Sequence, residues 1–116
     1  MSAAAKSVFY FGLYLYLVGF ALMIAPDFLL SLTQMPATQE VWIRVVGVLT
    51  IAIAFYYQQA GSKNIIAFFP LTVVVRIFVF LSFIGLVLLN FASPMLIGFG
   101  IVDLLGAIWT WIALKK

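Results

Sequence analysis

The sequence contains no cysteine and no histidine. Without these residues the chain cannot form a disulfide, a thiolate nucleophile or an imidazole base, and it lacks the commonest ligands of zinc, haem and iron–sulfur clusters. A Ser-His-Asp or Cys-His catalytic set is excluded for the same reason. We therefore predict no catalytic residue and no metal site. The sequence favours a protein that is not an enzyme, and it requires no cofactor.

Charged residues are also scarce, at 8% of 116 residues with three acidic and six basic side chains, whereas soluble domains carry about 25%. Hydrophobic residues make up 67% of the chain, and the mean hydropathy is +1.30. This composition indicates an integral membrane protein whose main partner is the lipid bilayer. The basic residues are scattered, and four of them flank apolar runs, so membrane topology explains them and no nucleic-acid partner is predicted.

Four apolar runs are long enough to approach the roughly 20 residues that a helix needs to cross a bilayer. We predict an all-α integral membrane protein with one membrane domain over residues 1–116, a four-helix transmembrane bundle with helices at about 6–25, 39–58, 65–90 and 94–114. The connector over residues 26–40 mixes leucines with polar residues, which predicts a short interfacial segment after the first helix. Thr38 is expected to cap the second helix, with Glu40 near its positive end.

The lysines predict which side of the membrane each loop faces. Lys6 precedes the first helix, Lys63 lies between the second and third, and Lys115 and Lys116 end the chain. The other two connectors contain no lysine or arginine. Because cytoplasmic loops carry an excess of Lys and Arg, we predict that both termini lie in the cytoplasm, an N-in and C-in topology.

Three ionisable residues, Arg44, Arg76 and Asp103, lie within the apolar runs. Asp103 lies about 13 Å from the outer start of the fourth helix, and Arg76 about 16 Å from the inner start of the third. Both therefore fall near the midplane, where each unpaired charge costs about 2.5–3.5 kcal/mol, and we expect them to pair. Arg44 extends outward, bonds the Glu40 carboxylate one turn earlier, or turns inward to form a two-arginine clamp on Asp103.

Helical spacing places Arg44 and Asp103 on faces rich in small residues, which membrane helices use for close packing. The shared faces are Gly100, Asp103, Ala107 and Thr110 in the fourth helix, Arg44, Gly47, Ile51, Ala54 and Gln58 in the second, and Gly12, Tyr16, Gly19 and Met23 in the first. We predict that Arg44, Arg76, Asp103 and Tyr16 form a ligand-binding site inside the bundle. The alternative is that the Arg76–Asp103 pair only fixes helix register.

The stretches PDFLLSLTQMP and WIRVVGVLTIAIAFYY, an arginine in the third helix and VDLLGAIWTWIAL in the fourth resemble small bacterial four-helix membrane proteins of the DoxX-like kind. The shared motifs are Arg44-x-x-Gly47, a tyrosine at the end of the second helix and Asp103. The resemblance spans most of the chain. It implies a bacterial cytoplasmic (inner) membrane location and an association with quinone-linked redox complexes. The absence of cysteine leaves a quinone or lipid pocket as the implied ligand site.

The residues predict a non-enzymatic membrane protein, an accessory subunit or a binder of a lipophilic small molecule, with Arg holding an oxygen and Asp103 orienting the arginines. One alternative is a proton-coupled small-molecule transporter that uses Asp103. Another, from the resemblance alone, is a component of a quinone-linked oxidoreductase complex. The sequence is compatible with a membrane-protein partner and with a homo-oligomer.

Overall fold

The computed structural model describes residues 2–115. These residues form five helices and no strand: α1 (Ala3–Ile24), α2 (Pro26–Leu32), α3 (Trp42–Ser62), α4 (Phe68–Leu88) and α5 (Met95–Lys115). The four helices other than α2 are long and apolar enough to cross a membrane. The predicted all-α class and the four spanning helices are therefore confirmed, and the short α2 follows the first span as expected.

Three of the helices end in the same way, which produces the sharp reversals between them. The second residue after each helix end, Gln34, Asn64 or Asn90, has a positive φ of 56°, 52° or 66°. The next backbone N–H then bonds the carbonyl five residues back, as in Ile65 to Ala60 at 2.9 Å. This is the Schellman arrangement, in which asparagine is a frequent substitute for glycine.

The start of α3 differs from the sequence prediction. The helix begins at Trp42, its N-cap residue is Val41, and no side chain caps it. The Thr38 hydroxyl instead accepts a hydrogen bond from the Glu40 N–H at 3.1 Å, within the connector. The Thr38 N–H donates to Asp27 at 3.4 Å, which ties this part of the connector to α2 and away from the helix start. The expected Thr38 cap was wrong.

Glycines allow α1 and α3 to pack with their backbones in contact. A Cβ atom on Gly47 would lie 2.6 Å from the Met23 nitrogen and 2.7 Å from the Gly19 carbonyl oxygen. A Cβ atom on Gly12 would lie 3.0 Å from the Tyr57 Cβ. The small-residue faces predicted for these two helices therefore face each other, as is usual for close pairs of membrane helices.

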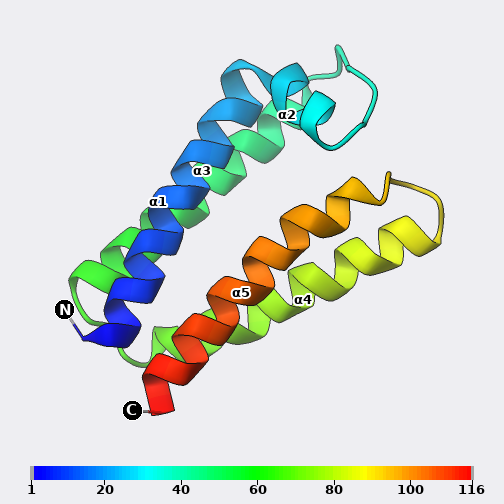
Figure 1. Cartoon of the computed structure of the whole chain (residues 1–116). Helices are drawn as coiled ribbons and strands as arrows, with labels where there is room; N and C mark the ends of the chain where they lie inside the picture. Colours follow the sequence, from blue (N-terminus) through cyan, green and yellow to red (C-terminus); the bar gives the residue numbers. More distant parts are fainter. Residues whose placement is uncertain (1, 116) are drawn as a thin grey trace.

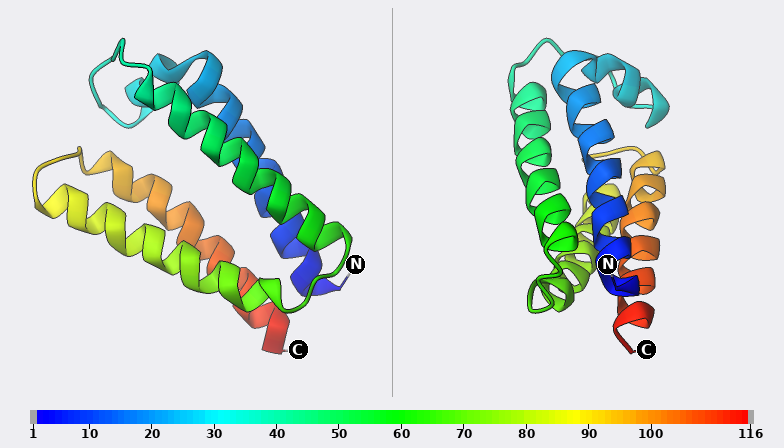
Figure 2. Two further views of the ribbon diagram at one scale, coloured as in Figure 1. Left: turned by 180° about the vertical axis from the view of Figure 1, so that it is seen from behind. Right: turned by 90° about the vertical axis from the view of Figure 1, so that its left-hand side faces the viewer.

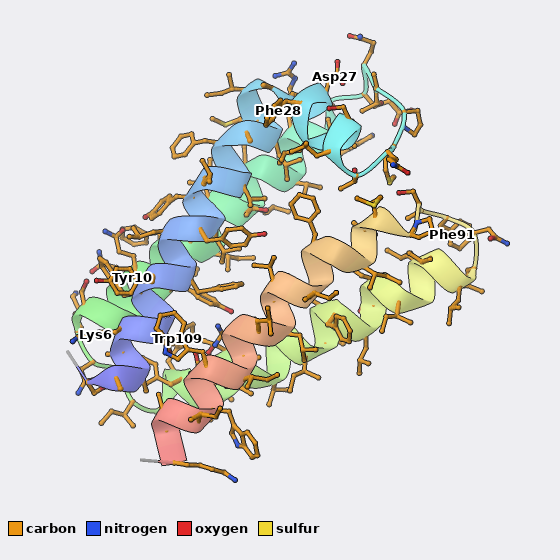
Figure 3. The ribbon with its side chains drawn as sticks, viewed as in Figure 1. Lys6, Tyr10, Asp27, Phe28, Phe91 and Trp109 are labelled. Carbon is orange, nitrogen blue, oxygen red and sulfur yellow. The ribbon has the colours of Figure 1, made fainter. Side chains whose placement is uncertain are left out.

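The bundle consists of two helical pairs, α1 with α3 and α4 with α5. The pairs meet near the chain termini and diverge toward α2 (Figures 1 and 2). Where they meet, a buried core forms from Ala4, Ala5, Val8, Phe11, Tyr57, Ala60 and Phe69. Tyr10 and Trp109 stack on the outside of this junction with ring centroids 6.5 Å apart (Figure 3). We call this the terminal end of the bundle and the opposite one the α2 end.

The charges at the two ends differ in sign. Both chain termini lie at the terminal end (Figure 1), where Lys6, Lys63 and Lys115 are also found. Asp27, Glu40 and Arg44 belong to the α2 end, whose side chains therefore carry one net negative charge. A hydrogen bond from the Ser93 hydroxyl to the Thr33 carbonyl links the α4–α5 loop to the end of α2. The arrangement agrees with four antiparallel spans, while the cytoplasmic location of the terminal end stays a prediction.

Candidate ligand cavity

A cavity of about 410 Å³ occupies the space between the diverging helical pairs. Its walls come from all five helices, and most of its lining residues are aliphatic or aromatic. The polar residues that line it are Tyr14, Thr33, Thr50, Tyr57, Arg76 and Asp103. A mainly apolar cavity of this size with a few polar groups is typical of a small-molecule site.

Arg76 lies at the deep end of this cavity and is almost completely buried, with 1% of its surface exposed. Its Nε donates to the Thr72 carbonyl at 3.1 Å, one turn earlier in α4. Its Nη2 donates to the hydroxyl of Thr72 at 2.9 Å and to the hydroxyl of Thr110 in α5 at 2.8 Å. The guanidinium group therefore joins α4 to α5 through neutral oxygens.

The bond to Thr110 continues into α1. The Ser7 hydroxyl donates to the Ala4 carbonyl at 2.7 Å and also lies 2.7 Å from the Thr110 hydroxyl. Because the Ser7 proton is used, Thr110 is the donor of that second bond. A buried chain thus runs from Arg76 through Thr110 and Ser7 to the backbone of α1. Such a network stabilises the junction only while every member has its partner.

An aromatic ring and a glycine also surround the guanidinium group. It lies over the Phe11 ring, with its central carbon 4.7 Å from the ring centroid, which is a cation–π contact. Gly106 provides the space beside it, since a Cβ atom there would lie 3.0 Å from Nη1 of Arg76. This same Nη1 is buried and has no hydrogen-bond partner. Leaving a buried donor unpaired costs about 1–3 kcal/mol, and more for a charged group.

The expected direct pair of Arg76 with Asp103 is not formed, because none of the guanidinium hydrogen bonds goes to the carboxylate. The two residues do line the same cavity. Side chains in a helix lean toward its N-terminus. Since α4 and α5 are antiparallel, Arg76 leans toward the terminal end and Asp103 toward the α2 end, so the two side chains diverge from similar depths.

Arg44 lies outside this site. Its guanidinium group donates to the carbonyls of Met23 and Ile24 at the end of α1, and the residue is exposed. A cation is favourable there, because the last carbonyls of a helix lack partners and carry its negative dipole end. The two-arginine clamp on Asp103 is therefore absent, and the exposed Arg44 bonds the end of α1 and not the Glu40 carboxylate.

Tyr16 is also directed away from the cavity lining. Its hydroxyl donates to the Gln58 side-chain oxygen at 2.8 Å, between α1 and α3. The reason is the shared face with Gly12 and Gly19, since that face packs on α3. The structure thus brings Arg76 and Asp103 to one cavity and leaves Arg44 and Tyr16 elsewhere.

The sequence prediction omitted Tyr14 and Tyr57 from the site, although both line the cavity with Arg76 and Asp103. The available signal was spacing: Phe11, Tyr14 and Val18 recur at helical intervals on one face of α1, and all three line the cavity. That signal does not stand out, because α1 is apolar on every side. Thr110 had been placed on the Asp103 face, but its bond to Arg76 was not foreseen.

Comparison with known proteins gives no relative: no family model, curated protein or solved structure matches this chain.

Proposed function

We propose that this chain is a non-enzymatic membrane protein that binds a lipophilic small molecule in the cavity between its helical pairs. Arg76 donates a hydrogen bond to an oxygen of the ligand, and Asp103 supplies the second polar contact. The single observation that carries the proposal is the buried Nη1 atom of Arg76, which lacks a partner in a residue that lines a 410 Å³ apolar cavity. An oxygen acceptor on the ligand would complete its hydrogen bonding once the side chains that cover Nη1 move aside.

The shape of the bundle favours binding over passage. The terminal end is closed by a packed core and by the chain from Arg76 to Ser7. A transporter that uses Asp103 would need a path through this end, and the buried contacts fill it. The cavity therefore has one polar end and a blocked exit, which suits a molecule that is held by the protein.

The proposed membrane, host and role of the protein are supported by its sequence. The lysines at the terminal end support a cytoplasmic membrane with both termini inside. The resemblance to DoxX-like proteins supports a bacterial host and a role as an accessory subunit, with a quinone among the lipophilic molecules that would fit. An oxidoreductase complex would supply the redox partner, since this chain offers no cysteine or histidine to carry that chemistry.

The experiment is native mass spectrometry of the protein extracted from its membrane into nanodiscs without detergent. Two variants in α4 are compared with the wild type. Val79→Trp fills the cavity that Val79 lines. Val74→Trp adds the same bulk on a side chain that is 65% exposed on the lipid-facing surface, so it is the matched control.

We expect a retained small molecule in the wild type and in Val74→Trp, and its loss in Val79→Trp. A molecule retained equally by all three proteins would contradict binding in this cavity. Binding in this cavity would also be contradicted if the wild type carried only phospholipids, in the proportions of the surrounding membrane. Circular dichroism of each variant confirms that the helices are intact.

A further inference from the structure

The polarity of the cavity changes along its length. At the α2 end its walls are apolar, formed by Leu22, Leu29, Leu30, Met35 and Ile43. Thr33 lies at this end as well, whereas Thr50 lies about 12 Å along α3 from its start, level with Asp103. Both hydroxyls already donate to a backbone carbonyl three or four residues earlier. The other polar residues of the lining, Tyr14, Tyr57, Arg76 and Asp103, lie at or below the middle of the helices, and the two charged ones are Arg76 and Asp103.

The deep end of the cavity lies near the middle of the spanning helices. Arg76 is about 12 Å along α4 from its start at the terminal end, and Asp103 about 12 Å along α5 from its start at the α2 end. A helix of this length spans about 30 Å. A molecule that enters between the helical pairs thus meets its polar contacts at the membrane centre and apolar walls closer to the surface.

The charges that line the cavity cancel, since they are one guanidinium and one carboxylate. An anionic headgroup would face Asp103, and a cationic one would face Arg76, in a region where an uncompensated charge is costly. The guanidinium offers a donor at Nη1, and the carboxylate offers only acceptors. A neutral hydroxyl group suits both, because it accepts from the first and donates to the second, directly or through one water.

We propose that the ligand is a neutral lipophilic alcohol that binds with its hydroxyl between Arg76 and Asp103 at mid-membrane depth and its apolar body directed toward α2. This inference rests on the proposed function and names the ligand class of the same cavity. The orientation is opposite to that of a phospholipid in the leaflet at the α2 end, whose headgroup would meet the apolar wall. The cavity therefore discriminates against the bulk lipid that surrounds it.

The test uses hexadecanol with a photoreactive diazirine at the far end of its chain, added to the full chain in phosphatidylcholine nanodiscs. Unlabelled hexadecanol, hexadecane and hexadecanesulfonate compete for labelling, and the labelled residues are mapped by peptide mass spectrometry. The three competitors share a chain length and differ only in the head: a hydroxyl, no polar group and a permanent anion.

We expect labels on residues 29–35, from α2 and the chain after it. Hexadecanol should compete at least about tenfold better than either other compound, the ratio expected for a hydrogen bond to a charged group. In Asp103→Asn the cavity carries one net positive charge, so the preference should move to the sulfonate. That reversal is a change that a misfolded or merely loosened bundle would not produce.

Other outcomes separate the two proposals. If hexadecane competes as well as hexadecanol, or if the sulfonate is preferred by the wild type, the cavity is occupied but the alcohol is the wrong class. Labels on Tyr14 and Tyr57 in place of residues 29–35 would show the reverse orientation, which also overturns the inference. If no compound competes for a label on any lining residue, both the inference and the proposed function fail.

Discussion

Thr110→Val removes one hydroxyl from the buried chain between three helices while keeping the volume of the side chain. The variant loses the 2.8 Å bond from Arg76 and the 2.7 Å bond to Ser7. A bond to a charged group contributes about 1.5–3 kcal/mol and a neutral one about 0.5–1.5 kcal/mol. Since Arg76 keeps its two bonds to Thr72, we expect the free energy of unfolding to fall by about 2–4 kcal/mol.

The measurement is reversible unfolding in mixed micelles with rising dodecyl sulfate, followed by circular dichroism. Thr50→Val is the matched control, because the Thr50 hydroxyl bonds only the Val46 carbonyl of its own helix at 2.8 Å. We expect its stability to change by less than about 0.5 kcal/mol, as for substitutions away from buried features. Equal stabilities of the two variants would refute the claim that the Arg76–Thr110–Ser7 chain holds the helical pairs together.

Three further substitutions test the packing and the excluded residue. Gly106→Ala places a methyl group 3.0 Å from Nη1 of Arg76 and 2.8 Å from the Phe11 ring. The free energy of unfolding should therefore fall by about 1–3 kcal/mol. In the control Gly98→Ala the methyl group meets nothing within 4 Å, so stability should be unchanged or up to about 1 kcal/mol higher. Gly47→Ala places a methyl group 2.6 and 2.7 Å from backbone atoms of α1 and should lower the free energy of unfolding by about 3 kcal/mol. Its control is Gly85→Ala, which has open space around it. Equal losses in the two variants would argue against backbone contact between α1 and α3. Arg44→Met should lose about 1 kcal/mol of stability or less, because the Arg44 bonds to the end of α1 are exposed. The variant should still retain the cavity ligand in native mass spectrometry. Loss of the ligand would show that Arg44 contributes to the binding site.

Apolar run length was sufficient to predict the four spanning helices, and a mixed connector was sufficient to predict a short helix over part of residues 26–40. The faces of small residues were also readable, because glycine at helical spacing has few uses in a membrane other than close packing. Gly12, Gly19 and Gly47 confirm this at the α1–α3 contact.

The sequence could not show that the two helical pairs diverge. In α1 and α4 apolar residues cover every side, so periodicity does not indicate which face meets a neighbour and which meets lipid. The cavity depends on that divergence, and its tyrosines were missed for this reason. Tyr16 was preferred because it shared a face with two glycines, but that face is used for packing against α3.

The expected ion pair between Arg76 and Asp103 was wrong for a different reason. Depth calculated from residue number treats each side chain as level with its own Cα atom. Over two antiparallel helices, the lean of side chains toward each N-terminus moves the charged groups in opposite directions. The bonds from Arg76 to Thr72 and Thr110 follow from this lean, and a rule that included it would have favoured them over the acid.

The most direct test of ligand binding at Arg76 uses the two arginines of the chain, Arg44 and Arg76. Isotope labelling of arginine nitrogens gives two guanidinium groups in a solid-state NMR spectrum, and Arg44→Met assigns them. Spectra of the protein in native nanodiscs and after removal of all lipophilic molecules are compared. We predict that the Arg76 side-chain resonances shift on removal and that those of Arg44 do not. An unchanged Arg76 signal, in a sample whose retained molecule has been removed, would contradict ligand binding at this group.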